Sequence, residues 1–324
     1  MTDQEQALHP LLVEQVVRES VGVLSLRLVR SDGGELPQWS PGAHLDVLLP
    51  SGLLRQYSLC GDPCERKAYH IAVLREPEGR GGSREVHDTL LAGCELRVRG
   101  PRNHFHMLPA SRYLFLAGGI GITPILPMAR EAGRRGVPWR LVYGGRTRDT
   151  MAFVEELLAL PGGEVDIVPQ DERGLLALDE LLDGEVAGTA VYCCGPEPMI
   201  RAVETASARR LPSGSLHVER FAASSTKLAA SDPRAPGTFE VELRRSGVTL
   251  PVPLDRTLLE VVREVVPTAL SSCEEGFCGA CETTVLDGVP EHHDSILTDE
   301  ERAACGTMMI CVGRSCSPRL VLDI

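Results

Sequence analysis

The sequence lacks the features of a membrane or exported protein. Within its 324 residues, no apolar run is long enough to span a bilayer. The polar start MTDQEQALHP does not have the form of a signal peptide. Positive charge is also scarce, with 33 Lys and Arg against 45 Asp and Glu and a net charge of −12. We therefore expect a cytoplasmic protein that binds neither a membrane nor nucleic acid.

Internal repeats are absent too, and the length allows two or three domains. The chain has 11 cysteines, an odd number, and without a secretion signal they predict free thiols in a reducing compartment. The stretch at 222–237, AASSTKLAASDPRAPG, is rich in Ala, Ser and Pro and has no periodic apolar face. It predicts a linker over residues 223–236, which separates a C-terminal domain at 237–324.

A set of cysteines in the C-terminal domain has the spacing of iron ligands. Cys273, Cys278 and Cys281 are separated by four and then two residues, and a more distant cysteine completes the set. On spacing alone, Cys305 and Cys311 both suit this fourth position. The pattern is the plant-type one for a [2Fe-2S] cluster held by four thiolates. A zinc site is the alternative, but such sites usually use a second Cys-x-x-Cys pair or histidine partners.

The first 108 residues are predicted to form a small antiparallel β-barrel. Apolar runs that end in Gly or Pro recur along them, as VGVLSLRLV, HLDVLLP, RQYSLC, YHIAVLRE and ELRVRG. One helix, expected over 83–92, follows Gly81 and Gly82 and begins with Ser83 as its capping residue. A glycine loop before a helix start is suited to an anion, because free N–H groups and the helix dipole both favour negative charge.

Arg55, Tyr57 and Ser58 lie on one predicted strand of this barrel. Alternation places Arg55 and Tyr57 on the same face. A guanidinium that binds phosphate, beside an aromatic ring that lies along a planar group, would make a site for flavin mononucleotide (FMN). A surface arginine and a core tyrosine are the alternative interpretation.

From Tyr113 onward, predicted strands and helices alternate. The strands are YLFLAGG, WRLVYGG, VDIVPQ, TAVYCCG and SLHVERF. Helices are expected between them over 124–135, 152–159 and 197–210 and at LLALDELL. Five such strands predict an α/β domain with a doubly wound parallel sheet over residues 109–222. Nucleotides bind at the carboxyl ends of such strands.

The first turn of this sheet is rich in glycine. Gly118, Gly119 and Gly121 precede Thr123, a good N-cap, and Pro124, which suits a first helical turn. The glycines would let the backbone approach a pyrophosphate at the helix N-terminus. A turn needed only for tight packing is the alternative.

Other strand ends carry further candidates. Cys194, followed by Gly195 and Pro196, ends the fourth strand. Its thiol would line a nicotinamide pocket or, alternatively, be a small buried hydrophobe. Asp171 ends the third strand, where a carboxylate suits an adenosine ribose and repels a 2′-phosphate. Arg146 follows the second strand and could contact a phosphate.

Taken together and in order, RQYS, GRGGS, AGGIGITP, CCGP and HVERF, followed by the cysteine loop, resemble one family. It is that of the class IA oxygenase reductases, such as phthalate dioxygenase reductase and vanillate demethylase reductase, within the ferredoxin–NADP reductase superfamily. The resemblance runs from about Leu11 to Ile324. It implies an FMN-binding barrel, a nicotinamide domain and a β-grasp ferredoxin domain. Strands around Ser246–Gly247, a helix near 257–265 and strands at CETTVLDG and RLVLDI agree with the last.

The resemblance also implies roles for individual residues. It places Thr123 near flavin and nicotinamide together, Cys194 beside the nicotinamide, and Phe221 over the other flavin face. It favours Cys311 as the fourth iron ligand, because MMICVGRS resembles the ferredoxin segment. It assigns flavin binding to Arg55, Tyr57, Ser58, Ile71, Ala72, Val73, Gly81, Gly82 and Ser83.

The predicted activity follows from these cofactors. Nicotinamide gives two electrons as a hydride and an iron–sulfur cluster accepts one, so a flavin must stand between them. We expect a monomeric NADH-dependent reductase that serves a terminal oxygenase, of Rieske type or a haem monooxygenase, acting on an aromatic or similar small substrate. A stand-alone diaphorase and a redox sensor are the alternatives. Glu219 is expected either to tune the flavin or to form a salt bridge at its strand end.

Overall fold

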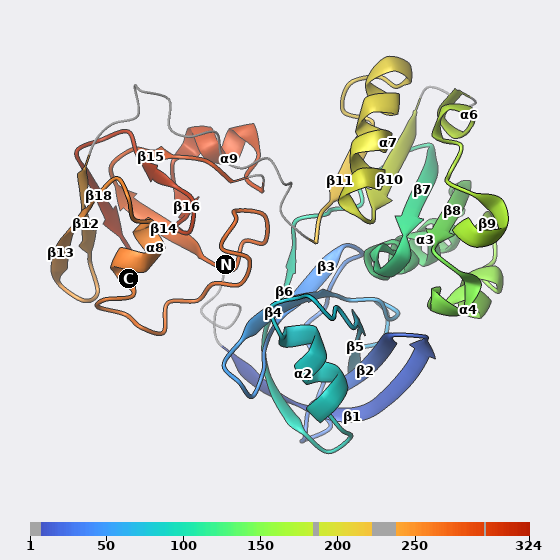
Figure 1. Cartoon of the computed structure of the whole chain (residues 1–324), viewed down its shortest axis with the longest axis horizontal. Coiled ribbons are helices and arrows are strands. Elements are labelled where there is room, and N and C mark those ends of the chain that lie inside the picture. Colours follow the sequence, from blue (N-terminus) through green and yellow to red (C-terminus); the bar gives the residue numbers. More distant parts are fainter. Residues whose placement is uncertain (1–7, 184–187, 222–237, 295) are drawn as a thin grey trace. The chain divides into compact units, whose positions relative to one another are not determined.

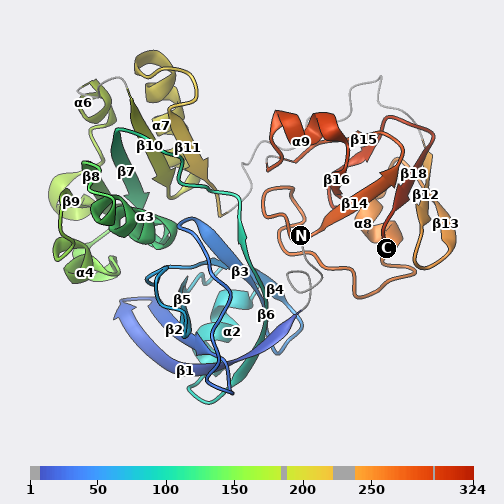
Figure 2. The same cartoon turned by 180° about the vertical axis from the view of Figure 1, so that it is seen from behind.

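The structure is a computed structural model, and it describes residues 8–183, 188–221, 238–294 and 296–324. The chain separates into two compact units, Met1–Arg220 and Phe221–Ile324, and each is described by itself. Figure 1 shows the ribbon, and Figure 2 shows it from behind. The predicted linker at 223–236 lies outside the described residues. None of the helices in the described ranges is long and apolar enough to cross a membrane.

The first unit begins with a six-stranded antiparallel sheet in the order β4-β3-β6-β1-β2-β5. An isolated bridge between Leu59 and Ile71 joins the end of β4 to β5, so the sheet closes on itself. Leucine and valine side chains from all sides fill its interior, and Val86 of helix α2 packs there as well. The elements are β1 (His9–Ser20), β2 (Val23–Val29), β3 (Ala43–Leu48), β4 (Leu54–Ser58), β5 (Ala68–Leu74), α2 (Gly82–Thr89) and β6 (Glu95–Asn103).

The second half of this unit is a five-stranded parallel sheet in the order β11-β10-β7-β8-β9. Helices α3 and α4 pack on one apolar face, and α6 and α7 pack on the opposite one, as a doubly wound sheet requires (Figure 1). The main elements are β7 (Arg112–Gly118), α3 (Ile122–Arg134), β8 (Trp139–Gly145), α4 (Val154–Leu158) and β9 (Gly163–Pro169), then α5 (Gln170–Arg173), α6 (Leu178–Asp183), β10 (Thr189–Cys194), α7 (Glu197–Arg210) and β11 (Leu216–Glu219). Two short 3₁₀ turns, η1 (Gly119–Gly121) and η2 (Arg148–Thr150), precede α3 and α4.

The second unit is a sheet in the order β13-β12-β18-β14-β16, packed around a single apolar core. Helix α8 begins with a capping box, in which Thr257 accepts a hydrogen bond from the backbone of Glu260 and the Glu260 carboxylate accepts one in return. The elements are β12 (Phe239–Leu243), β13 (Val248–Val252), α8 (Leu258–Val262), β14 (Glu282–Asp287), β15 (Pro290–Glu291), α9 (Asp299–Ala304), β16 (Thr307–Met309), β17 (Arg314–Ser315) and β18 (Arg319–Leu322).

Three local predictions are wrong. Gly81, in left-handed conformation with φ of 87°, is the N-cap of α2, so Ser83 lies inside the helix. Gly121 takes the N-cap position of α3, because η1 already turns the chain, and Thr123 is a helical residue. Asp171 does not end a strand but lies in α5, since β9 stops at Pro169, which donates no ladder hydrogen bond.

Candidate functional site

The predicted phosphate-binding residues of the barrel lie together. A Cβ atom on Gly82 would fall 2.5 Å from Nε of Arg55, so the glycine leaves room for the guanidinium at the start of α2. Arg55 also donates hydrogen bonds to the carbonyl oxygens of Leu54 and Arg80, at 2.8 and 2.9 Å. A fixed cation beside free N–H groups at a helix start fits a phosphate monoester. The Ser83 hydroxyl accepts a hydrogen bond from the backbone N–H of Glu76, at 3.0 Å.

Tyr57 and Gln56 point to opposite sides of β4. Tyr57 is partly buried and packs against the barrel core, and burial raises the pKa of its hydroxyl. Gln56 instead donates a hydrogen bond to the buried carboxylate of Asp46, at 2.8 Å. Tyr57 therefore packs on the barrel core, while Arg55 lies at the helix start, and FMN binding by this strand stays a prediction.

The strand β5 has one face in the barrel and one face toward the parallel sheet. Ile71 and Val73 lie in the barrel core. Ala72 points the other way, into a small cluster with Val23, Cys60 and Ala152. This strand therefore lies where the barrel meets the parallel-sheet half of the unit.

The glycine turn after β7 packs tightly against the end of β10. A Cβ atom on Gly121 would fall 2.2 Å from the carbonyl oxygen of Cys194, and one on Gly118 would fall 2.7 Å from Cδ of Pro196. Gly119, at φ of 53°, meets nothing within 4 Å. Two of the three glycines thus serve close packing, and the third leaves open backbone. The Thr123 hydroxyl donates a hydrogen bond to the Ile120 carbonyl, at 3.0 Å, which holds the turn together.

Three predicted residues converge at the carboxyl ends of the strands. Cys194 and Glu219 are paired across β10 and β11, and the Ser58 hydroxyl of the barrel donates a hydrogen bond to the Glu219 carboxylate. Burial raises the pKa of Glu219 to about 8, and the bond from Ser58 opposes this only in part. Glu219 makes no ion pair within the described ranges, and its Oε2 atom is buried without a hydrogen-bond partner. The salt bridge expected as one alternative is formed by Arg220 instead, with Glu197 and Glu204.

Cys194 is wholly buried in the apolar core. Burial, and then the nearby Glu219 carboxyl, raise the pKa of its thiol well above its usual value. The side chain is therefore a neutral thiol and not a nucleophile. It fits the alternative interpretation, that of a small buried hydrophobic residue.

The adenosine candidates are adjacent but exposed. The backbone N–H of Asp171 donates a hydrogen bond to the Arg146 carbonyl, at 3.2 Å, so α5 folds back over the end of β8. Both side chains are exposed. Phe221, 42% exposed, is the first residue of the second unit.

The four predicted iron ligands gather in the second unit. Cys273, Cys278, Cys281 and Cys311 are all buried. The thiol of Cys273 is within hydrogen-bonding reach of those of Cys278 and Cys311, and Cys281 is within reach of Cys311. These contacts lower the pKa of Cys273 and Cys281 and raise that of Cys278 and Cys311.

Backbone donors also point at these sulfurs. The N–H groups of Cys273 and Glu275 donate to the sulfurs of Cys278 and Cys273, each at 3.3 Å. No group of three or more His, Cys, Asp or Glu within the described residues is arranged for a single metal ion. A two-iron cluster is a larger group, and four converging buried thiols with backbone donors fit it. The Cys305 thiol instead donates a hydrogen bond to the Arg302 carbonyl near the end of α9, at 3.4 Å.

A residue that the sequence did not indicate supports this loop. Asp294 is buried, and its carboxylate accepts hydrogen bonds from the N–H groups of Ile296 and Leu297, at 3.1 and 2.9 Å. A Cβ atom on Gly276 would fall 3.1 Å from Cα of Asp294. The segment around Asp294 therefore lies directly behind the cysteine loop. Gly276 and Asp294 are 18 positions apart in the sequence, so their proximity could be seen only in the folded structure.

The comparisons with known proteins agree with this arrangement. Residues 241–316 match the 2Fe-2S iron-sulfur cluster binding domain, and residues 115–205 match the oxidoreductase NAD-binding domain. The phthalate 4,5-dioxygenase oxygenase reductase subunit of Pseudomonas putida is 40% identical over 94% of this chain and 93% of its own. The solved structure of phthalate dioxygenase reductase, a modular structure for electron transfer from pyridine nucleotides to [2Fe-2S], is 35% identical, with a TM-score of 0.71 and full coverage of both chains.

A larger protein contains a similar part. The structure of an intact type IV self-sufficient cytochrome P450 monooxygenase is 43% identical and matches with a TM-score of 0.88 over 99% of this chain. This chain spans 41% of that protein.

These findings define the class of protein: an oxidoreductase built from a barrel, a nucleotide-binding sheet and a [2Fe-2S] ferredoxin domain. The chain belongs to the phthalate dioxygenase reductase family of oxygenase reductases. The family, the fold class and the enzyme class predicted from the sequence are therefore confirmed.

Proposed function

We propose that this chain takes electrons from NADH and delivers them singly, through FMN and a [2Fe-2S] cluster, to a terminal oxygenase. One observation carries the proposal: a nucleotide-binding sheet and a cluster-binding domain belong to one chain, together with a barrel whose Arg55 lies at a helix start. When bound, a flavin accepts electrons in pairs and releases them one at a time. The type of oxygenase and the monomeric state are part of the proposal.

The residues of the first unit are assigned by where they lie. Arg55 and the backbone of Gly81, Gly82 and Ser83 hold the flavin phosphate at the start of α2. Tyr57, Ser58 and the backbone of Ile71, Ala72 and Val73 hold its ring. Gly118, Gly119, Gly121 and Pro124, with Gly195 and Pro196 before the 14-residue helix α7, hold the pyrophosphate of NADH.

Polar groups at the strand ends orient the nicotinamide. Thr123 keeps the glycine turn closed, and Cys194 lines the pocket as a neutral thiol. Glu219, whose pKa burial raises to about 8, accepts a hydrogen bond from the Ser58 hydroxyl. Phe221 shields the outer face of the flavin. Asp171 binds the adenosine ribose, and its carboxylate favours NADH over NADPH because it repels a 2′-phosphate, while the adjacent Arg146 contacts a phosphate.

Absorption spectroscopy of the purified whole chain tests the proposal. We expect bands of both flavin and cluster, and FMN, not FAD, after heat release. Anaerobic titration should consume about 1.5 NADH per chain, because flavin and cluster together take three electrons and NADH gives two. A chain without flavin, or one that NADH does not reduce, would refute the proposal. Turnover with cytochrome c would exclude the redox sensor, and electron delivery to a co-encoded oxygenase would exclude the stand-alone diaphorase.

Iron ligation is tested separately by two matched substitutions. Cys311→Ser should abolish the cluster spectrum, because its thiol lies against those of Cys273 and Cys281. Cys305→Ser should leave the spectrum intact, since Cys305 bonds to the end of α9. The reverse result would show that Cys305 is the fourth ligand.

A further inference from the structure

Phe153 has an unusual backbone conformation for its residue type. It is the N-cap of α4, with φ of 61° and ψ of 17°, in the left-handed region. Non-glycine residues rarely occupy this region, and for a bulky residue it is an outlier. Within the described residues, Glu274 and Cys305 are the other non-glycine residues with positive φ. Such a conformation persists only where the surroundings over-determine it, so its side chain is the place to look for a reason.

The side chain of Phe153 packs where the barrel meets the nucleotide-binding sheet. It lies against a buried group of four residues, which we name the seam cluster: Val23, Cys60, Ala72 and Ala152. The first three come from the barrel, and Ala152 precedes α4. Phe153 also packs against the core beneath α3. The ring therefore touches both halves of the first unit.

Hydrogen bonds hold the two halves together on either side of the ring. The N–H of Val21, at the β1–β2 turn, donates to the Asp149 carbonyl at 2.9 Å, and the Ser20 hydroxyl donates to the Thr150 carbonyl at 3.2 Å. On α3, Arg130 donates to the Cys60 carbonyl at 3.1 Å. These bonds join the two halves of the unit near the seam cluster, of which Cys60 is a member.

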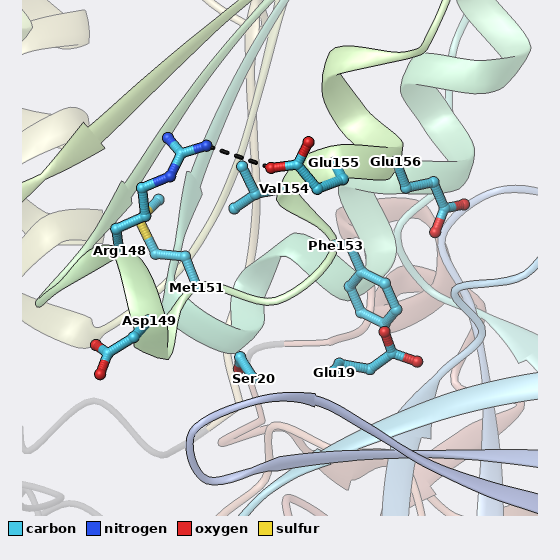
Figure 3. Close-up of a pocket in the computed structure, with 9 residues that line it drawn as sticks. All are labelled: Glu19, Ser20, Arg148, Asp149, Met151, Phe153, Val154, Glu155 and Glu156. Atoms are coloured by element: carbon cyan, nitrogen blue, oxygen red, sulfur yellow. Dashed lines mark hydrogen bonds and ion pairs between the residues drawn. The ribbon is translucent and has the colours of Figure 1, made fainter.

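The ring is not enclosed on every side. It borders an open pocket of about 450 Å³, with Glu19 and Ser20 on the barrel side and Met151 and Val154 on the sheet side. Figure 3 shows the ring pointing from the start of α4 toward the segment that carries Glu19 and Ser20. Removing the ring therefore enlarges an existing pocket, and the two halves lose the group that spaces them.

Two functional segments rest on the same seam cluster. Ala72 is a member of it and belongs to β5, the strand to which we assign the flavin ring. Ile120, within the glycine turn assigned to NADH, packs against it as well. From these contacts we infer that Phe153 is a positioning residue, which sets the separation between β5 and the glycine turn and so the approach of nicotinamide to flavin. The inference rests on the function proposed above.

Positioning of this kind makes a specific kinetic prediction. Misplacement of reacting groups by about 1 Å can slow a reaction about a hundredfold without abolishing binding. The test must separate the effect of losing the ring from the effect of disturbing the left-handed backbone, and asparagine tolerates that backbone conformation. Phe153→Asn thus removes the ring and keeps the backbone preference. Phe153→Tyr keeps the ring, and Leu158→Ala, at a half-exposed position of the same helix, controls for general damage to α4.

The experiment is anaerobic stopped-flow reduction of the bound flavin by NADH in the whole holoprotein. We expect Phe153→Asn to slow flavin reduction at saturating NADH by about tenfold or more, while the flavin content and the dissociation constant for NADH change by less than about threefold. Phe153→Tyr and Leu158→Ala should remain within about twofold of the wild type. A wild-type rate in Phe153→Asn would overturn the inference, as would an equal loss in Leu158→Ala.

A folding failure would be recognised and resolved. If Phe153→Asn did not retain flavin, Phe153→Leu, which keeps apolar bulk without the ring, would take its place under the same criteria. Failure of the proposed function itself has a different signature, since the wild-type flavin would then not be reduced by NADH at all, although dithionite would still reduce it.

Discussion

Two carboxyl groups of the first unit differ in their surroundings: Asp46 is fully buried within the barrel sheet, whereas Glu219, at the strand ends of the nucleotide-binding sheet, is partly buried, with its Oε2 atom enclosed. Asp46, fully buried on β3, accepts hydrogen bonds from Arg99 at 2.7 Å, Arg102 at 2.7 Å and Gln56 at 2.8 Å. Burial alone would raise its pKa, but Arg102 and Arg99 overcome burial and lower it. Glu219 accepts a hydrogen bond from the Ser58 hydroxyl but has no ion pair among the described residues, and burial raises its pKa to about 8.

The difference separates a carboxylate that is held in its charged form from a carboxyl group that favours its protonated form. A buried carboxylate between two guanidinium groups stays charged and ties β3 to β6. A carboxyl group that is removed from water without a cation beside it lowers the stability of the fold whenever it ionises. Glu219 lies between the barrel and the strand ends, beside Cys194, where a held proton is useful to redox chemistry.

The largest effect is expected where the charged network is broken. Asp46→Asn removes the negative charge from between Arg99 and Arg102, and breaking a buried ion pair costs about 3–5 kcal/mol. Chemical denaturation of the holoprotein measures this loss of unfolding free energy. Asp32→Asn, which breaks the exposed pair with Arg30, is the matched control and should change stability little. If Asp46→Asn unfolded at the same denaturant concentration as the wild type, the network would not stabilise the barrel.

The cysteine loop of the second unit and the candidate sites of the first unit were not equally predictable from the sequence. The cysteine loop is local, and its spacing predicted three of the ligands directly. Arg55, Gly82 and Glu219 were singled out one by one, but their meeting is tertiary: 27 residues separate Arg55 from Gly82, and 161 separate Ser58 from Glu219. The network of Asp46 was missed because Arg99 and Arg102 lie more than 50 residues away along the chain.

The remaining local errors have physical reasons. Strand β1 was missed because only Leu11 and Val13 of its 12 residues are fully buried, so the sequence shows little alternation. The prediction of Thr123 as an N-cap was wrong because the preceding glycines form a 3₁₀ turn, and α3 begins directly after it. The left-handed conformation of Phe153 could not have been predicted, since phenylalanine rarely adopts it and the contacts of its ring with the seam cluster are tertiary.

An effect that depends on pH, with a definite sign, is expected from Glu219→Gln. The folded pKa of Glu219, about 8, lies above the unfolded value, so the folded state binds more protons. The stability from this group is complete below the unfolded pKa and is lost as pH rises through about 8. Glutamine does not titrate. Between the unfolded pKa and about pH 8, the unfolding free energy of the variant should therefore rise relative to that of the wild type by roughly 1 kcal/mol per pH unit. Melting temperatures from pH 5 to pH 9 measure the difference, and parallel pH profiles would contradict the assignment.

The smallest effect sharpens the comparison most directly, because it removes the hydrogen bond that opposes the effect of burial on Glu219. The Ser58 hydroxyl donates to the Glu219 carboxylate and lowers its pKa, in opposition to burial. Ser58→Ala removes this donor, at a cost in stability of about 1 kcal/mol, the usual value for one hydrogen bond. The midpoint of the Glu219-dependent pH profile should move upward, further from the usual range of a glutamic acid. In the Glu219→Gln background the same serine substitution should leave the pH profile flat. A downward movement of the midpoint, or no movement, would show that Ser58 does not hold the ionised carboxylate and that another group sets its pKa.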